Sequence, residues 1–436
     1  MHVRKTIALL GCLAAAACEN GGSGMTIDYP ETRRGDTVDN YHGTRVADPY
    51  RWMENLESAE VQSWVAAQNA IAEPYLEAIP ARQPIIDRLT ALWNYERYSI
   101  PFKEGDRYFY SYNNGLQNHD VLYVTDAPGE QGRVLLDPNT FSEDGTVSLG
   151  NVVASPDGST IAYSVSDGGS DWKQWRVRDV ETGQDLPDLL LYTKFTGASW
   201  ARDGSGFYYS RYPLNAAGEA DGGKAVSVYY HALGTPQSED TLVYSLPEHG
   251  TWNPYATVTE DGKYLVITIE EGYFTNAVHY MTLDEGSGPV VELLTEWDAY
   301  YEFLGNDGSE FYFKTTNDAP NGRVIAIDVT QPAPENWREV IPERERALEA
   351  ASLVGGHIVA QYLEDARAQV GVFDLAGNHL RDVELPGPGS VGGFRGRMDD
   401  TETFFRFESF ADPGAIWRYD VATGERELFR RIEVKA

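Results

Sequence analysis

The sequence has 436 residues, with 35 Lys and Arg against 67 Asp and Glu, which gives a formal net charge of −32. A surface of that sign repels phosphate backbones and anionic lipid head groups, so it argues against nucleic-acid binding and against membrane docking through charge. The hydrophobic content of 42%, with 12% aromatic residues, supports a packed core and argues against a disordered chain.

Residues 1–24 differ in composition from the rest of the chain and predict an export signal peptide. A basic start, MHVRK, precedes the short apolar run TIALLGCLAAAA and the polar linker CENGGSG. The apolar run is too short to span a membrane as a mature helix, which favours a cleaved signal. The segment resembles a bacterial lipoprotein signal, because Cys18 follows small residues and precedes the linker. That resemblance implies lipidation of Cys18.

The predicted location is outside the cytoplasm, either periplasmic or anchored to the membrane by lipid at Cys18. Ala15 stands where lipoprotein signals usually carry Leu, so secretion without a lipid stays open as the alternative. Cys12 and Cys18 are the only cysteines, and both lie in this segment. The mature domain therefore has no disulfide to form, although the compartment is oxidising.

Residues 25–95 form the next predicted segment, which contains two helices between Ser58 and Tyr95. Ser58 is a favourable N-cap, and Pro84 suits the first turn of the second helix. Apolar residues recur at helical spacing behind both starts, and such stripes need a covering surface. These residues are Val61, Trp64, Val65, Ile71, Tyr75 and Leu76 in the first helix, and Ile85, Ile86, Leu89, Leu92 and Trp93 in the second.

One phrase returns at regular intervals from residue 96 to residue 436. SPDGSTIAYS, which begins at Ser155, returns as ARDGSGFYYS, TEDGKYLVIT and GNDGSEFYFK, and degenerate copies contain Gly105, Gly356 and Asp400. Asp-Gly suits a tight turn, and the alternating apolar residues after it suit a strand, so each copy predicts a β-hairpin. A second phrase such as WRVRDVETGQDL lies between the copies and adds another hairpin.

Seven such units, spaced 44 to 58 residues apart and each with four strands, predict a seven-bladed β-propeller. The fold class is therefore all-β, preceded by a short helical segment. A single blade cannot bury both faces of its sheet, and stacking of blades explains the regular spacing. The longest interval contains YPLNAAGEADGGKAVS from Tyr212, which predicts a loop insertion on one rim.

The residues of the chain offer no candidate for catalysis, for a metal ion or for a cofactor. No serine has glycines both two residues before and two residues after it, and the eight histidines have no metal-ligand spacing. GPGSVG from Gly387 fits the dinucleotide pattern but contains Pro388 and lacks a preceding strand and a following helix, which favours a loop between blades.

Several longer phrases resemble the amino-terminal half of the prolyl oligopeptidase family. They include VADPYRWMENLES, NYERYSIPF, GSDWKQWRVRDVETG and YYHALGTPQSEDTLVY, and the resemblance runs from Met25 to Ala436. In that family a seven-bladed propeller caps an α/β-hydrolase catalytic domain, and the segment before the propeller packs against that domain. The resemblance implies that the Ser, Asp and His of catalysis lie in a hydrolase domain missing from this chain, so the chain alone is expected to be inactive.

The resemblance also implies three candidate substrate contacts. The phrase KFTGASW matches the family where Phe195 is an apolar contact with the substrate, although packing within a blade is an equal alternative. Asn253 stands where the family often has an apolar residue, and Tyr273 stands where it often has a small one. Because of both departures, the resemblance does not predict the shape of the pocket.

Two functions stay open at this point. The first is the non-catalytic part of an exported prolyl-oligopeptidase-like serine peptidase, which would control the access of short proline-containing peptides to the hydrolase domain. The alternative is a stand-alone propeller that serves as a binding or scaffold module. A propeller hydrolase would need paired acids at matching blade positions, and the repeats show none.

Overall fold

The computed structural model describes residues 27–283 and 288–434. The predicted signal peptide, with Cys12 and Cys18, lies outside the described residues. The chain divides into two compact units, residues 1–91 and residues 92–436. In the described part of the chain, no helix is long and apolar enough to cross a membrane.

The N-terminal unit begins with a hairpin of β1 (Val38–Tyr41) and β2 (Thr44–Ala47), and a 3-10 turn (Arg51–Glu54) follows it. Two helices come next, α1 (Ala59–Glu77) and α2 (Arg82–Trp93). The Oγ of Ser58 accepts a hydrogen bond of 3.2 Å from the Val61 amide, which is the predicted N-cap.

Most apolar side chains of the two helices are exposed in this unit. Val61 is the one hydrophobic side chain of α1 that is buried, and none of those described in α2 is buried. The predicted apolar stripes therefore form but are not covered by the rest of the unit. The exposed members are Val65, Tyr75, Leu76, Ile85, Ile86, Leu89, Leu92 and Trp93.

The described part of the second unit contains seven antiparallel sheets, each a meander in chain order, as predicted for a seven-bladed propeller. Sheets one and two consist of β3 (Arg97–Tyr98), β4 (Phe102–Glu104), β5 (Arg107–Asn113), β6 (Val121–Thr125) and β7 (Arg133–Leu136), then β8 (Ser148–Ala154), β9 (Thr160–Ser166), β10 (Trp172–Asp179) and β11 (Asp185–Lys194). Sheets three and four consist of β12 (Ala198–Trp200), β13 (Gly206–Arg211), β14 (Ser227–Ala232) and β15 (Thr241–Ser245), then β16 (Asn253–Val258), β17 (Tyr264–Glu270), β18 (Asn276–Thr282) and β19 (Val291–Leu294). Sheets five to seven consist of β20 (Tyr301–Asp307), β21 (Glu310–Thr315), β22 (Arg323–Asp328) and β23 (Arg338–Ile341), then β24 (Ala347–Val354), β25 (His357–Glu364), β26 (Arg367–Asp374) and β27 (His379–Asp382), and last β28 (Ser390–Arg395), β29 (Glu402–Ser409), β30 (Asp412–Asp420) and β31 (Arg426–Arg431).

The first sheet departs from the predicted four strands because its first strand is interrupted. Both β3 and β4 pair with β5, and the chain between them contains Pro101. Proline has no amide hydrogen to donate to a ladder, so the pairing breaks there and resumes at Phe102. No α-helix occurs among the described residues after Trp93, where short 3-10 turns are found at Pro138–Thr140, Gln237–Glu239 and Pro334–Asn336.

The Asp-Gly phrases lie where they are predicted, in the turns between the first and second strands of the blades. Gly158 adopts a φ of +69°, which is the left-handed region that favours glycine. A Cβ at Gly158 would overlap the carbonyl oxygen of Glu104, and a Cβ at Gly105 would overlap that of Asp157. The turns of blades one and two thus touch backbone to backbone, whereas at Gly204 and Gly308, where a Cβ would meet no atom within 4 Å, the positive φ alone favours glycine.

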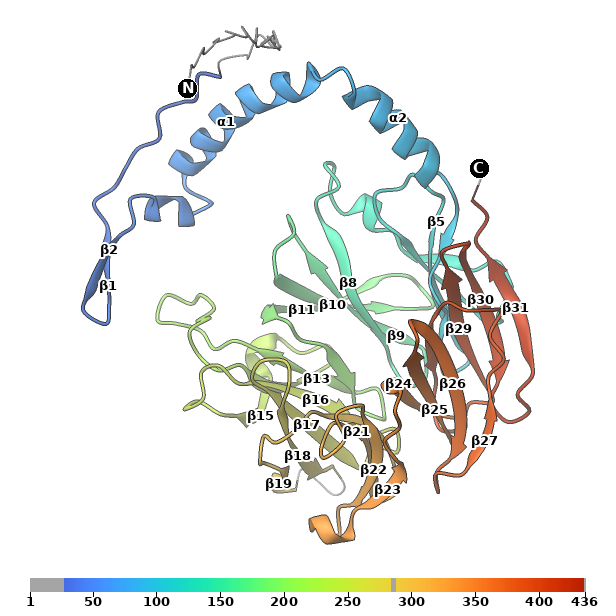
Figure 1. Ribbon diagram of the computed structural model, residues 1–436. Helices are drawn as coiled ribbons and strands as arrows, with labels where there is room; N and C mark the ends of the chain where they lie inside the picture. The colour runs from blue at the N-terminus through green and yellow to red at the C-terminus, as the bar shows by residue number, and fades with distance from the viewer. Residues whose placement is uncertain (1–26, 284–287, 435–436) are drawn as a thin grey trace, which may run out of the picture. The chain divides into compact units, whose positions relative to one another are not determined.

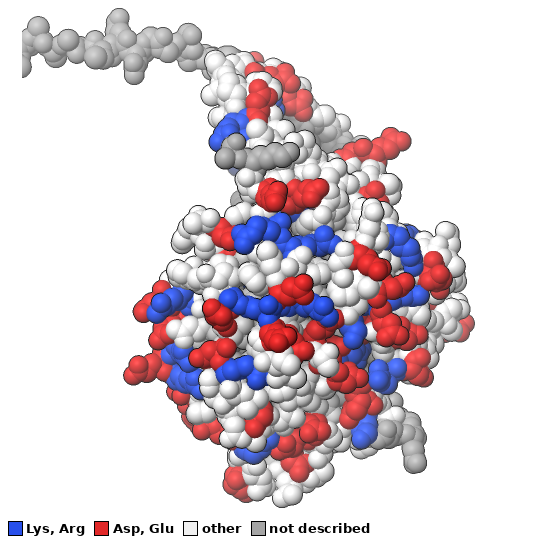
Figure 2. All heavy atoms as spheres, turned by 90° about the vertical axis from the view of Figure 1, so that its right-hand side faces the viewer, with Lys and Arg blue, Asp and Glu red and all other residues white. Residues whose placement is uncertain are grey.

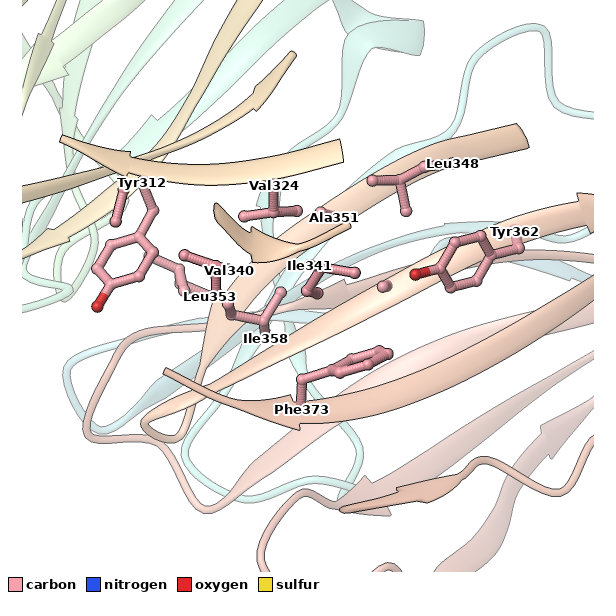
Figure 3. Packing of buried hydrophobic residues seen from close by; sticks show 12 residues of the cluster. Tyr312, Val324, Val340, Ile341, Leu348, Ala351, Leu353, Ile358, Tyr362 and Phe373 are labelled. Carbon is pink, nitrogen blue, oxygen red and sulfur yellow. The ribbon is translucent and has the colours of Figure 1, made fainter. Parts of the chain in front are cut away.

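Neighbouring sheets pack face to face through apolar clusters. Figure 3 shows the cluster between blades five and six, where Tyr312 and Val324 lie across from Leu353, Ile358 and Phe373. These side chains are at most a few per cent exposed, so the facing surfaces of the two sheets are removed from water. The hydrophobic driving force therefore lies between the blades, which is why they fold as one array.

The seventh blade packs beside the first without sharing a strand with it (Figure 1). Lys103 Nζ lies 2.8 Å from Asp400 Oδ1, and the Tyr108 hydroxyl donates to Glu402. The Arg430 guanidinium lies 4.4 Å from the ring centroid of Tyr98. Side-chain contacts, rather than a composite sheet, therefore join the two ends of the propeller.

Candidate functional site

The strand order gives the propeller two opposite rims. The turns between first and second strands, and those between third and fourth strands, form what we call the Asp-Gly rim. The turns between second and third strands, and the links from one blade to the next, form what we call the linker rim. Chain segments that meet at one rim come from residues far apart in the sequence.

At the Asp-Gly rim, side chains from the ends of the first strands meet across the propeller axis. Arg397 of blade seven lies 2.6 Å through Nη2 and 2.8 Å through Nε from Glu104 Oε2 of blade one. Glu260 Oε2 of blade four accepts a hydrogen bond of 2.9 Å from the amide of Met398 in blade seven. Blades four and seven are not neighbours in the array, so this hydrogen bond crosses the axis.

These contacts separate two cavities along the axis. The inner cavity has a volume of about 430 Å³ and is lined by first-strand residues such as Val153, Trp200 and Val258. The outer cavity has a volume of about 320 Å³ and is lined by turn residues that include Asp307. Both cavities have the same three charged residues in their walls, which we call the axial partition: Arg202, Glu260 and Arg397.

Burial changes the acidity of Glu260 in the axial partition and of Glu104, which pairs with Arg397. Burial raises the pKa of Glu104 above its ordinary value, and the Arg397 guanidinium opposes that rise. Burial likewise raises the pKa of Glu260, against the hydrogen bond from the Met398 amide. Both carboxylates therefore take up a proton at a higher pH than an exposed glutamate does, and the ion pair with Arg397 weakens as the pH falls.

The linker rim carries the most exposed aromatic side chains of the propeller. Tyr273 and Phe274 lie between β17 and β18 and are 90% and 84% exposed, and Phe410 between β29 and β30 is fully exposed. Among the described residues, no exposed large apolar side chain lies in a turn between a first and a second strand. The most exposed aromatic side chains of the propeller therefore lie on the rim opposite the axial partition.

The three predicted substrate-contact residues all lie on the linker rim. Phe195 follows β11 with a φ of +53° and is 58% exposed, so it is not part of the blade core, and Lys194 Nζ lies 4.8 Å from its ring centroid. Asn253 begins β16 and donates from Nδ2 to the Thr251 carbonyl at 3.3 Å. Tyr273 makes no hydrogen bond within the described residues. Their role as substrate contacts stays a prediction.

Sequence reasoning missed a buried charge cluster between blades two and three. His231 Nδ1 lies 2.7 Å from Asp240 Oδ1, and His231 Nε2 lies 3.0 Å from Asp188 Oδ1, with all three side chains fully buried. Burial alone lowers the pKa of His231, but the hydrogen bonds to Asp240 and Asp188 outweigh it and raise that pKa. The phrase YYHALGTPQSED contains His231 and Asp240, whereas Asp188 comes from the preceding blade.

The structure brings no catalytic constellation together in the part of the chain that it describes. Groups of three or more His, Cys, Asp or Glu placed to hold a metal ion are absent from the residues described. Charged side chains of both signs are interspersed over the face shown in Figure 2.

Comparisons with known proteins agree with one another. The family model "Prolyl oligopeptidase, N-terminal beta-propeller domain" matches residues 30–431. The prolyl endopeptidase of Elizabethkingia meningoseptica is 36% identical over 437 residues, which is 100% of this chain and 61% of the relative. The dual function macrocyclase-peptidase POPB of Amanita bisporigera is 32% identical, over 90% of this chain and 58% of its own.

Solved structures show the same similarity in three dimensions. A structure from work on two prolyl endopeptidases has a TM-score of 0.85 and 34% identity, and the match covers 94% of this chain and 60% of that one. Prolyl oligopeptidase B from Galerina marginata, bound to a 25mer macrocyclization substrate, has a TM-score of 0.83 and 31% identity over 94% of this chain and 61% of that one. The chain thus spans about three fifths of the length of the relatives it matches.

Proposed function

Because the chain belongs to the prolyl oligopeptidase family, whose N-terminal β-propeller domain it contains, we propose that it is the non-catalytic part of a serine peptidase of that type. The observation that carries this proposal is the match over residues 30–431, together with the 61% of the relative's length that the chain covers. The nucleophile, base and orienting acid are proposed to lie in the remaining length of such an enzyme. The proposed substrates are short peptides that contain proline.

We propose that the propeller controls the access of peptides to the catalytic domain. A peptide that moves along the axis must separate Glu260 from Met398 and Arg397 from Glu104, because these contacts cross or border the axis. The inner cavity of about 430 Å³ is of the size that holds a small ligand, so it has no room for a folded protein. The size of the permitted substrate would then follow from the propeller and not from the catalytic residues.

We propose that the catalytic domain docks on the linker rim of the propeller and, as a separate contact, on the exposed faces of α1 and α2 in the N-terminal unit. Contiguous exposed apolar surface is typical of interfaces with a partner or domain. Tyr273 and Phe274 of blade four form one exposed apolar pair on the rim, Phe410 of blade seven is exposed at a separate place on it, and Ile85 and Leu89 are exposed on α2. Burying these side chains would stabilise the docked state by about 25 cal/mol for each Å² of apolar surface removed from water.

We also propose that the protein is exported and that Cys18 carries a lipid. The order of basic, apolar and small residues in the first 18 positions supports this proposal. A single hydrocarbon chain binds a membrane only weakly, so a stable anchor needs more than one, and a lipoprotein cysteine carries several acyl chains. Release of a soluble form after cleavage is the competing outcome.

A chimera tests the catalytic part of the proposal. This chain would be joined to the part of the Elizabethkingia meningoseptica prolyl endopeptidase that it does not match, and cleavage of a short chromogenic proline peptide would be measured. We expect the chimera to cleave the peptide and the 436-residue chain alone to leave it intact. Phe410→Asp should lower the activity of the chimera several-fold, whereas Leu242→Asp, at an exposed position on the fourth strand of blade three, β15, should not. A folded but inactive chimera would contradict the proposal.

A further inference from the structure

A cavity of about 710 Å³ lies on one face of blade two, away from the axial partition. Tyr163 and Val165 of β9, Trp172 and Gln174 of β10, and Leu191 of β11 line it. The segment between β7 and β8 closes one side with Phe141. The volume falls within the range of about 300 to 1,000 Å³ that is typical of small-ligand sites.

One side of this cavity carries a fixed polar network. The Tyr163 hydroxyl donates to Asp185 at 3.0 Å, and Arg178 Nε lies 2.7 Å from the same carboxylate. Burial raises the pKa of Tyr163 to about 12, so the hydroxyl stays a donor at neutral pH. Arg178 and Asp185 therefore neutralise each other and hold this wall in place.

Arg176 differs from Arg178 because it has no carboxylate partner within ion-pair distance among the described residues. It lies opposite Tyr163 in the β9–β10 register, on the same face of the sheet. The lining as a whole has three cationic and two anionic side chains, in a chain whose net charge is −32. The cavity thus presents an unpaired guanidinium, and a guanidinium binds a carboxylate through two parallel hydrogen bonds.

Aromatic residues stand beside this cation. Trp172 is 39% exposed and packs edge to face against Tyr212 at 5.3 Å, and Tyr192 adopts a φ of +64°. A positive φ is an outlier for a bulky side chain, and such strain is concentrated at binding sites. Lys194 Nζ lies 5.8 Å from the ring of Trp172 and 4.8 Å from that of Phe195, so the cavity adjoins the predicted substrate contact.

We propose that this cavity is a second binding site, separate from the axis, for short peptides that end in a free carboxylate. Arg176 binds the carboxylate, the Gln174 amide pairs with a peptide group, and Trp172 and Tyr192 pack against an apolar or proline side chain. The choice of a peptide rests on the proposed function, whereas the choice of a carboxylate rests on Arg176. A peptidase releases a product with such a carboxylate at each turnover, so the site is suited to hold product.

Calorimetric titration of the 436-residue chain tests the proposal without any catalytic domain. The probes are acetyl-Ala-Phe-Pro with a free carboxylate and the same peptide with a carboxamide, which differ in one charge. We expect the acid to bind about tenfold more tightly than the amide, because Arg176 is partly buried and a charge-assisted hydrogen bond there is worth about that much. Arg176→Gln should remove that preference, and Trp172→Ala should weaken both peptides.

Arg367→Gln is the matched control, because it removes the same charge at an exposed position outside the cavity and should leave both affinities unchanged. Thermal unfolding of each variant verifies that the fold is intact. Equal binding of acid and amide, an acid preference that survives Arg176→Gln, or no binding of either peptide at millimolar concentration would overturn the proposal. A chimera that cleaves peptides while this titration fails would refute the second site and leave the proposed function standing.

Discussion

Replacing His231 by phenylalanine should lower the free energy of unfolding of the propeller more than the same replacement of a buried histidine that has no carboxylate partner. Both ring nitrogens of His231 face carboxylates, Asp240 at 2.7 Å and Asp188 at 3.0 Å. Asp240 also accepts from the Tyr209 hydroxyl at 2.5 Å, and Asp188 from the Gly234 amide at 2.6 Å. Phenylalanine keeps the ring volume but leaves two buried carboxylates without a cation.

The magnitude follows from the cost of uncompensated buried charge. Removing one partner of a buried ion pair typically costs about 3–5 kcal/mol, whereas a single buried hydrogen bond costs about 1–2 kcal/mol. His279→Phe is the matched control, since burial lowers the pKa of His279 and, among the described residues, its side chain hydrogen-bonds through Nδ1 to the Tyr244 hydroxyl at 2.9 Å. The two variants should therefore differ by roughly 2–3 kcal/mol in the free energy of unfolding.

Urea unfolding followed by tryptophan fluorescence measures this difference through the shift in midpoint. Adding Asp188→Asn and Asp240→Asn to His231→Phe should recover part of the loss, because the buried charges are then gone. Equal losses for His231→Phe and His279→Phe would refute the reasoning, as would a loss below about 1 kcal/mol for His231→Phe.

Three further outcomes follow from the structure. The pKa of His231 is raised in the folded state, so the stabilisation it provides is complete below its unfolded pKa of about 6.5 and is lost as the pH rises. The difference in the free energy of unfolding between wild type and His231→Phe should therefore shrink between pH 6 and pH 9. Gly158→Ala should lower the melting temperature more than Gly168→Ala, because both glycines have positive φ but only Gly158 would place a Cβ against the Glu104 carbonyl; equal shifts would contradict the packing of the Asp-Gly turns. Cys18→Ser should move the protein from the membrane fraction to the soluble one, and unchanged partitioning would refute lipidation while leaving export intact.

The repeated turns and the number of blades could be predicted from the sequence because their causes are local. Gly158 and Gly105 sit in turns whose backbone conformation needs glycine, and the strands after them alternate at the period of a sheet. The interruption of the first strand was not predicted, although Pro101 marks it, since a proline can equally end a strand. The predicted N-cap at Ser58 is local in the same sense, and it is confirmed.

The axial partition and the buried charge cluster could not be predicted, because their members come from different blades. Glu260 and Met398 are 138 positions apart, and the repeat spacing does not state which turns meet across the axis. Asp188 and His231 belong to successive blades and meet only when the sheets stack. Arg176 has no carboxylate partner among the described residues, whereas Arg178, two positions on, has one, and this difference depends on the folded face.

The most direct test of access control is the size selectivity of the chimera. The quantity to measure is the ratio of kcat/KM for a peptide of about 30 residues to that for an octapeptide with the same cleavage site. Arg397→Gln breaks the contact with Glu104, whereas Arg395→Gln removes the same charge from the wall of the inner cavity, where Arg395 has no ion-pair partner among the described residues. We predict that the ratio rises at least threefold for Arg397→Gln and stays unchanged for Arg395→Gln. An unchanged ratio for Arg397→Gln, or an equal rise for both variants, would contradict control of access by the axial partition.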